Sequence, residues 1–277
     1  MSKEDKEKIL RDEDHLQPEV VSKGLGSSVF AKNVIYHESL ESTNTLAKDL
    51  AIQGCPEGTV VLTEEQTQGR GRRGRTWLSP GRENLLFSVV LRPTMDPERV
   101  FVLTMILALA AADGINAVCG LTPGIKWPND LYLEGKKLAG ILTEFSTRER
   151  SVDYVVLGLG LNANWNPTGQ KGISNPATSL LAASGRRTDR NELLIRILGF
   201  LDVYYRDVLS GRIDSFHRRW NDLSMILGRE IAVESEGERI YGRAVRIDEV
   251  GALIIEDKGR RERRIINGEV SVRLRGS

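Results

Sequence analysis

Cysteine and histidine are scarce in this sequence of 277 residues. Cys55 and Cys119 are the only cysteines, which is too few for a disulfide framework, and they lack a C-x-x-C spacing. The three histidines are scattered, and none lies at metal-ligand spacing from another candidate ligand. These scarcities exclude a disulfide-stabilised secreted scaffold and argue against a zinc site made by protein side chains. We expect both thiols to be reduced.

An excess of charge of one sign is also missing. The sequence has 39 Lys and Arg against 38 Asp and Glu, a formal net charge of +1, so binding of nucleic acid or anionic lipid would need a local patch. Residues 1–8 are charged and lack the apolar core of a signal peptide. The most apolar run, Phe101–Ala112, ends at Asp113, far short of a membrane span. We therefore expect a cytoplasmic protein without a membrane segment.

Apolar and β-branched runs separated by Gly and Pro predict the secondary structure of the first two hundred or so residues. Strands are expected at 34–36, 59–63, 85–91, 125–127, 131–133, 138–144 and 154–160. Helices are expected at 45–53, 99–118, 191–209 and 213–223. The short spacings between the later strands favour antiparallel pairing. Residues 1–33 are polar and predict an N-terminal extension or linker with a helical turn or two.

The pattern changes after Gly228. Short strands separated by Gly or charged turns are expected at 231–234, 239–247, 252–256, 263–266 and 270–274. This pattern is typical of a small β-barrel of roughly 50 residues. We therefore divide the chain into an N-terminal extension (1–33), a large domain that would contain the catalytic site (34–227) and a C-terminal barrel (228–277).

The loop Gln66–Gly81 contains four glycines, and its segment Gly69–Gly74 matches the pattern G-x-G-x-x-G. In a dinucleotide-binding fold a helix opens directly after these glycines. Here Trp77-Leu-Ser-Pro-Gly81 follows, and it cannot start such a helix. We reject the dinucleotide interpretation.

Four arginines in this loop, Arg70, Arg72, Arg73 and Arg75, indicate a different role. Glycine lets backbone N–H groups approach an anion, and guanidinium groups bind carboxylate and phosphate oxygens. Such a loop would repel itself and become ordered only around an anion. A solvated basic loop or a weak nucleic-acid patch remains an alternative.

A second polar cluster, Lys126-Trp-Pro-Asn-Asp130, follows a short apolar strand. A bend at Pro128 would let Lys126 and Asp130 face one pocket. The alternative is a β-bend in which Asn129 and Asp130 satisfy their own backbone.

Lys137 and the glycines of Gly158-Leu-Gly160-Leu-Asn162 are the remaining candidates. Lys137 precedes a buried-looking strand and could place its ammonium on a phosphate, or be a solvated edge charge. Glycine inside a strand indicates close approach of a ligand or of another part of the protein. For Lys137, a phosphate-binding ammonium and a solvated edge charge both stay open. For the glycines, close approach of a ligand and close packing of the protein both stay open.

The order and spacing of these segments closely resemble the biotin–protein ligase family, also called biotin–[acetyl-CoA-carboxylase] ligase. The resemblance runs from about Val34 into the predicted barrel and rests on Ser42–Asn44, Gln66–Trp77, Lys126–Asp130, Lys137–Leu142 and Gly158–Asn162. It implies an α+β fold: a class II synthetase-like domain, with a mixed sheet and helices on one face, followed by an SH3-like barrel.

The resemblance also implies a reaction in two steps. Biotin and MgATP give biotinyl-5′-AMP and pyrophosphate, and biotin then passes to one lysine of a biotin carboxyl carrier protein or domain. Biotin, ATP and Mg²⁺ are therefore the expected ligands, and Mg²⁺ is expected to bind mainly through the ATP phosphates. The adenylate is an anhydride that water hydrolyses, which favours a loop that closes over it.

Site residues follow from the same resemblance. The biotin pocket is expected to contain Ser42, Thr43, Asn44, Gln66, Arg70, Gly71, Arg72, Lys137 and Gly140. The ATP or adenylate site is expected to contain Arg72, Trp77, Asn129, Lys137, Asn162 and Arg273. The catalytic group is expected to be Lys137, Arg72, Asp130 and Lys126, with Asp130 as the base for the acceptor lysine or as a magnesium ligand.

One departure from the family concerns its DNA-binding members. About 33 residues precede Val34, too few for the winged helix-turn-helix of those members. We expect neither repression nor nucleic-acid binding.

Family members often form homodimers through the sheet, so a homodimer is one expected state. The competing functions are a lipoate or octanoate ligase or transferase, and a regulator that binds DNA through the arginine loop.

Overall fold

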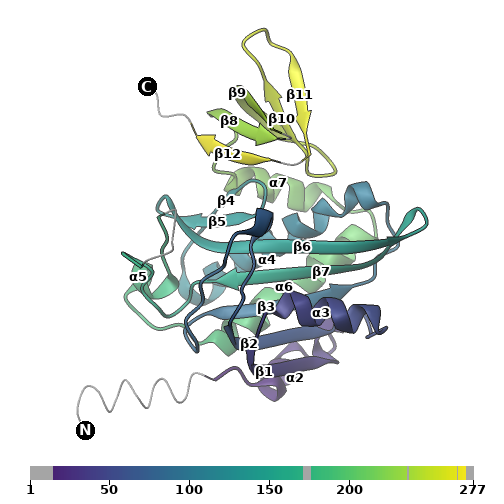
Figure 1. The fold of residues 1–277 in the computed structure, drawn as a ribbon, viewed down its shortest axis with the longest axis vertical. Coiled ribbons are helices and arrows are strands. Elements are labelled where there is room, and N and C mark those ends of the chain that lie inside the picture. The colour runs from purple at the N-terminus through teal and green to yellow at the C-terminus, as the bar shows by residue number, and fades with distance from the viewer. Residues whose placement is uncertain (1–14, 171–175, 236, 267, 273–277) are drawn as a thin grey trace.

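The computed structural model describes residues 15–170, 176–235, 237–266 and 268–272. Its larger part is a seven-stranded mixed sheet, which gives the order β1-β2-β3-β7-β6-β5-β4 (Figure 1). Strands β1 and β2 pair in parallel and the other neighbours pair antiparallel. The strands are β1 (Val34–Leu40), β2 (Val60–Gln66), β3 (Leu85–Leu91), β4 (Gly124–Lys126), β5 (Asp130–Leu133), β6 (Lys136–Arg148) and β7 (Ser151–Leu161). Every strand predicted in this region is confirmed.

Alternate residues of the central strands point to opposite faces of the sheet, and each face has its own apolar cluster. On β7, Val155 and Leu157 belong to the large core with α4 (Phe101–Cys119) and α6 (Arg190–Leu209). Tyr154 and Val156 belong to a smaller cluster with Ala47 of α3 (Thr43–Ile52). The two long helices thus cover one face, as expected, and α3 covers part of the other face (Figure 1).

Helix α4 is apolar on all sides. The helical stretch Pro97–Cys119 has 23 residues, and its most apolar window has a mean hydropathy of 1.9, which is long and apolar enough to cross a membrane. The apolar run is therefore longer than the sequence analysis inferred. However, 78% of its most apolar window is buried inside the fold. Its position between the sheet and α6 is that of the core helix of a globular domain.

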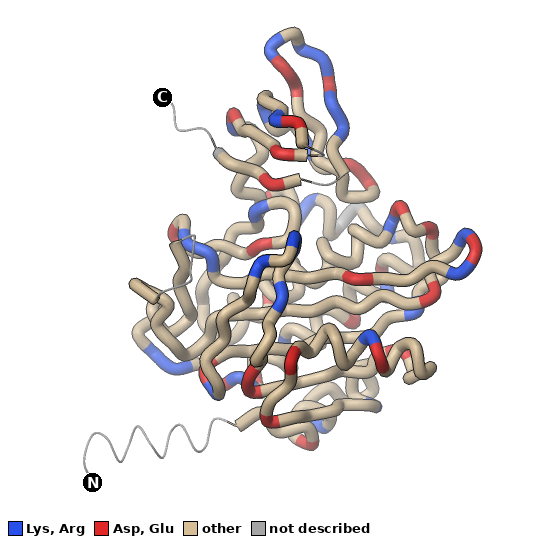
Figure 2. Tube along the Cα trace, viewed as in Figure 1, with Lys and Arg blue, Asp and Glu red and all other residues tan. Residues whose placement is uncertain are grey.

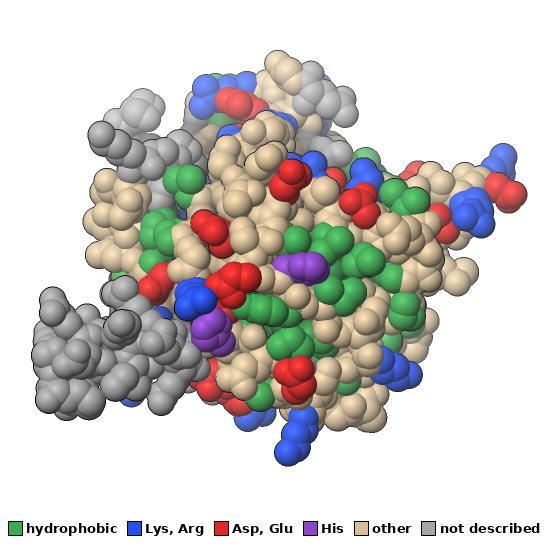
Figure 3. Space-filling view, turned by 60° about the horizontal axis from the view of Figure 1, so that its bottom comes forward, with side chains coloured by type: hydrophobic (Ala, Val, Ile, Leu, Met, Phe, Trp, Pro, Cys, Tyr) green, Lys and Arg blue, Asp and Glu red, His purple; other side chains and the backbone are tan. Residues whose placement is uncertain are grey.

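The described part of the N-terminal extension is built into the core. Helix α2 (Pro18–Leu25) buries Val21 and Leu25 in the large cluster, and Leu16 is also buried there. The Leu16 amide donates to Glu64 Oε1 (2.9 Å), and the other Glu64 oxygen pairs with Arg190 Nη1 (2.6 Å). Figure 3 turns this end of the molecule forward, where hydrophobic side chains are interspersed with acidic and basic ones. Residues 15–33 are thus packed structure rather than a linker.

The C-terminal part is a five-stranded antiparallel sheet with the order β11-β10-β9-β8-β12. Its strands are β8 (Glu230–Ser235), β9 (Glu238–Ile247), β10 (Leu253–Glu256), β11 (Glu262–Ile265) and β12 (Glu269–Val272). These antiparallel strands form the small SH3-like domain that was expected, and within the described residues no pairing joins β11 to β12 to close it into a barrel. Helix α7 (Asp214–Leu223) lies between the two sheets, and the short α5 (Leu180–Ser184) follows β7 (Figure 1).

Candidate active site

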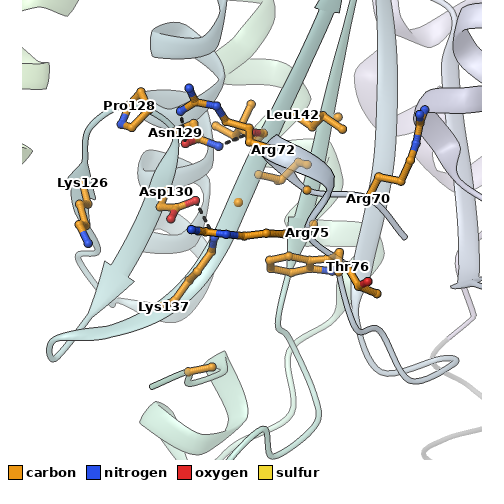
Figure 4. A pocket seen from close by; sticks show the side chains of 18 of the residues that line it. Arg70, Arg72, Arg75, Thr76, Lys126, Pro128, Asn129, Asp130, Lys137 and Leu142 are labelled. Carbon is orange, nitrogen blue, oxygen red and sulfur yellow. Dashed lines mark hydrogen bonds and ion pairs between the residues drawn. The ribbon is translucent and has the colours of Figure 1, made fainter. Parts of the chain in front are cut away.

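A pocket of about 590 Å³ lies on the sheet face that carries α3, bounded by the arginine loop and by β8 and β12 of the C-terminal sheet. Most of the predicted site residues line it: Ser42, Thr43, Asn44, Gln66, Arg70, Gly71, Arg72, Trp77, Lys126, Asn129, Asp130, Lys137, Gly140 and Asn162. Figure 4 shows the cationic side of this pocket. Arg273, also predicted, lies outside the described residues.

Glycines form the floor of the pocket. Gly140 of β6 lies opposite Gly160 of β7, and Gly158 continues the same face of β7. A Cβ atom at Gly158 would lie 1.9 Å from Asn44 Oδ1, and one at Gly160 would lie 2.6 Å from the Trp77 ring. The absence of side chains at these glycines is therefore what lets Asn44 and Trp77 lie directly on the strands.

One end of the pocket is polar and neutral. Helix α3 begins at Thr43, two residues earlier than predicted, with Ser42 as its N-cap residue. The Thr43 amide donates to Gln66 Oε1 (2.9 Å). Beneath them the Ser88 hydroxyl lies 2.8 Å from Thr43 Oγ1 and donates to Asn44 Oδ1 (2.7 Å). This end can bind a ligand through hydrogen bonds, and the charged groups beside it, Arg70 and Glu144, pair with each other at 3.6 Å.

The other end of the pocket is cationic. Lys137 Nζ lies 2.7 Å from Asp130 Oδ1, and their side chains are only 26% and 21% exposed. Lys126 lies nearby, with its Nζ 5.2 Å from the centre of the Tyr132 ring. Burial lowers the pKa of Lys126, and Asp130 partly opposes that shift. Burial, with a contribution from Asp130, raises the pKa of Tyr132 to about 12.

Asn129 links this end to the arginine loop. It accepts a hydrogen bond from Arg72 Nη1 (3.1 Å) and donates from Nδ2 to the Ile141 carbonyl (2.6 Å). The alternative of a bend whose Asn only satisfies its own backbone is therefore wrong. Burial and the neighbouring Arg73 lower the pKa of Arg72, but a guanidinium group stays charged in proteins.

The arginine loop is folded in the structure. The Gly71 amide donates to the Arg75 carbonyl (2.7 Å), and the Trp77 amide donates to the Gly69 carbonyl (2.9 Å). The Trp77 ring then lies against the floor, with Lys137 Nζ 5.7 Å from its centre. These hydrogen bonds hold the loop in the conformation described, and its ordering by an anion stays a prediction.

The four loop arginines reach different partners. Arg72 is directed at Asn129 (Figure 4). Arg70 points away from Asn129 and donates to Thr45 Oγ1 (3.1 Å). Arg75 forms an ion pair with Glu269 of β12 (2.6 Å), and Arg73 Nη1 lies 3.9 Å from the same carboxylate. In Figure 2 the loop rises from the larger sheet toward the C-terminal sheet. The loop is thus anchored to both sheets.

Sequence reasoning missed several residues of the site. Those that line the pocket or support its lining are Ser88, Tyr132, Glu144, Trp165, Glu234 and Glu269. Ser88 had one usable signal, since it is a polar residue inside a strand whose neighbours are apolar, and Glu144 had a weaker one, since it lies between Thr143 and Phe145. Glu269 had none, because its partners Arg73 and Arg75 are far away in the sequence.

Two family models match the chain. The model described as the biotin/lipoate A/B protein ligase family matches residues 36–162. The model described as the biotin protein ligase C terminal domain matches residues 226–273. The matched ranges contain the larger sheet up to β7 and the C-terminal sheet.

Named relatives and solved structures agree with these matches. The bifunctional ligase/repressor BirA of Bacillus subtilis is 35% identical over 234 residues, which is 84% of this chain and 72% of the relative. The biotin–[acetyl-CoA-carboxylase] ligase of Mycobacterium tuberculosis is 31% identical over 267 residues, 91% of this chain and 95% of the relative. The biotin protein ligase from Aquifex aeolicus in complex with biotin and ATP superposes with a TM-score of 0.74 and 28% identity, covering 87% of this chain and 99% of that one.

Proposed function

The chain belongs to the biotin/lipoate A/B protein ligase family, and we propose that it joins biotin to one lysine of a biotin carboxyl carrier protein or domain. In the first step a biotin carboxylate oxygen attacks the α-phosphorus of ATP, and pyrophosphate leaves. In the second step the lysine amine attacks the acyl carbon of biotinyl-5′-AMP, AMP leaves, and the amine loses a proton. The similarity to a biotin protein ligase solved with biotin and ATP supports both substrates.

The observation that carries this proposal is the division of the pocket into a neutral end and a cationic end. Biotin has the same division, because its bicyclic urea is neutral and its tail ends in a carboxylate. The Thr43, Asn44 and Gln66 end would bind the ring through hydrogen bonds. The Lys137 and Arg72 end would bind the carboxylate and the α-phosphate.

Adenylation brings two anions together, so fixed positive charge stabilises its transition state. Lys137 is the central cation in this proposal, because it lies in the pocket at the start of β6 and, among the described residues, pairs with Asp130 at 2.7 Å. Arg72 and Lys126 would supply further positive charge from the loop and from β4. Asn129 holds Arg72 in place.

The nucleotide would occupy the part of the pocket near Trp77, Asn129 and Asn162. Among the described residues no group of three His, Cys, Asp or Glu side chains is placed to hold a metal ion. Mg²⁺ commonly binds through one or two carboxylates together with substrate phosphates. Asp130 fits that pattern as a single protein ligand, with the ATP phosphates as the main ones.

Asp130 has a second proposed role in transfer. While it pairs with Lys137, its carboxylate is held by the ammonium group. Once Lys137 binds the adenylate phosphate, Asp130 is available to take the proton that the acceptor amine loses. A single pair would thus serve the first step through Lys137 and the second through Asp130.

A substrate-dependent exchange of pyrophosphate into ATP tests this function. We expect exchange with biotin and no exchange with lipoate, followed by labelling of one lysine in a biotin carboxyl carrier domain. Exchange with lipoate alone would contradict the proposal and assign the chain to the lipoate branch of the family. Exchange with biotin but no labelling of a carrier lysine would contradict the second step only.

A further inference from the structure

Two polar residues that do not line the pocket support its neutral end from beneath. Ser88 of β3 is fully buried, and Glu144 of β6 has a side chain that is 27% exposed. Both contact Asn44, whose side chain lies on the floor beside Gly158. Thr43 and Gln66 complete a chain of hydrogen bonds from Glu144 to the pocket wall.

The direction of the Asn44 amide is determined by Glu144. Asn44 Nδ2 donates one hydrogen to Glu144 Oε2 (2.9 Å) and lies 3.2 Å from the Leu142 carbonyl. A carboxylate and a carbonyl only accept hydrogen bonds, so the NH₂ group must face them. Asn44 Oδ1 therefore faces Ser88.

The same reasoning fixes the hydroxyl protons. An amide oxygen cannot donate, so the single hydroxyl proton of Ser88 is directed at Asn44 Oδ1. The contact of 2.8 Å between Ser88 Oγ and Thr43 Oγ1 is then made with the Thr43 proton, which has a second acceptor in Gln66 Oε1 at 3.2 Å. Thr43 Oγ1 is left with its lone pairs for a ligand, and a cyclic urea offers N–H donors to such an acceptor.

We propose that Glu144 is a positioning residue that fixes the Asn44 amide and, through Ser88, makes Thr43 an acceptor for the neutral ring of biotin. Asn44 and Thr43 line the pocket, and Glu144 acts through them. Without an acceptor at residue 144, the Asn44 NH₂ group keeps only its longer contact to the Leu142 carbonyl (3.2 Å), so the amide is held less firmly and can turn over. Ser88 would then donate to Thr43 Oγ1 and occupy a lone pair that a ring N–H would use, while the Thr43 proton passes to Gln66 Oε1. This inference rests on biotin being the ligand.

The test is a calorimetric titration of biotin into the full chain without ATP. In Glu144→Met, which keeps the side-chain length and removes the acceptor, we expect the Kd for biotin to rise about tenfold or more. Glu144→Gln keeps an acceptor oxygen and should stay within about threefold of wild type. The KM for ATP should change by no more than about twofold in both variants, because the network does not contact the cationic end. Glu149→Met, which removes an exposed carboxylate from the same hairpin, is the matched control.

Glu144 also lies 3.6 Å from Arg70 Nη2, so the two contacts must be separated. If the relay through Ser88 matters, Ser88→Ala should weaken biotin binding, and Glu144→Met should add less than about twofold in that background. In an Arg70→Met background the effect of Glu144→Met should persist in full. Thermal unfolding of each variant checks that it is folded, and Ser88→Ala alone still tests the relay should Glu144→Met not fold.

The results distinguish two failures. A wild-type chain that binds no biotin overturns the proposed function and this inference with it. Wild-type binding together with an unchanged biotin Kd in Glu144→Met overturns the inference alone. An effect of Glu144→Met that vanishes in the Arg70→Met background but not in the Ser88→Ala background also overturns it, because the loop would then carry the coupling.

Discussion

Lys137 and Asp130 face each other across the β5–β6 pair, with Lys137 Nζ 2.7 Å from Asp130 Oδ1 in a half-buried part of the pocket. Both residues were predicted as site residues from the sequence, but not as partners of each other. The pair keeps a cation and a carboxylate side by side at the place where two anionic substrates would meet. Each member can therefore be tested in a different step of the reaction.

Lys137→Ala should nearly abolish adenylation. Removal of one preorganised group that stabilises transition-state charge lowers the rate by about 10² to 10³, and we expect a loss of that size in biotin-dependent pyrophosphate exchange. Lys136→Ala is the matched control, because Lys136 is the exposed neighbour on the same strand. Exchange at the wild-type rate in Lys137→Ala would remove this residue from the reaction.

Asp130→Asn should affect the second step. A general base contributes roughly 10²-fold or more, so transfer from preformed adenylate to a carrier lysine should slow by about that factor. Formation of the adenylate in a single turnover should change far less. Glu134→Gln, in the exposed turn between β5 and β6, serves as the control. Equal slowing of both steps would instead indicate that Asp130 acts through the bound metal.

Gly158→Ala should damage the neutral end of the pocket. The new Cβ would lie 1.9 Å from Asn44 Oδ1, so Asn44 must move. We expect the Kd for biotin to rise about tenfold or more, since the Asn44 hydrogen bonds would be lost. Gly199→Ala in α6, where a Cβ meets nothing within 4 Å, is the control. It should raise stability by about 0.5–1 kcal/mol. A Gly158→Ala protein with normal biotin affinity would show that Asn44 can move without consequence.

Glu269→Gln should loosen the arginine loop. Glu269 pairs with Arg75 and lies near Arg73, and both pairs are partly exposed. Exposed pairs contribute about 0.2–1 kcal/mol each, so trypsin should cut the loop a few times faster in the variant. Glu262→Gln breaks a pair with Arg246 within the C-terminal sheet and is the control. Identical cleavage rates in both variants would show that Glu269 does not hold the loop.

Arg190→Met should destabilise the whole domain. Arg190 and Glu64 are 0% and 1% exposed, and removing the arginine leaves a buried carboxylate without its cation. The expected loss in the free energy of unfolding is about 3–5 kcal/mol, measured by urea denaturation. Adding Glu64→Gln should recover part of it. No recovery would mean that packing, rather than charge, dominates at this position.

The strands could be predicted because apolar runs are local signals, whereas the pocket residues were predicted from the order and spacing of motifs that resemble the biotin–protein ligase family. Strand β3 is apolar except for Ser88, and its bounds Leu85–Leu91 agree with the prediction. Arg72, Asp130 and Lys137 stand in polar or glycine-rich segments that interrupt such runs. The packing of residues 15–33 left no comparable signal, since only a few apolar side chains, such as Val21 and Leu25, carry it.

The support beneath the pocket could not be predicted for a different reason. Asn44, Ser88 and Glu144 come together only because β3, β7 and β6 pair in one particular register. Shifting a strand by one residue would move its side chain to the opposite face. No local pattern contains that register, so only the folded sheet can reveal the contact.

Helix α4 has one more consequence, which concerns the order in which the chain is made. The strands that cover it, β6 and β7, and its partner α6 all follow it in the sequence. A ribosome that has just completed α4 has therefore made a span-length apolar helix and none of these covering elements. Until Arg190–Leu209 emerges, this helix is the part of the nascent chain that must be kept from other apolar surfaces.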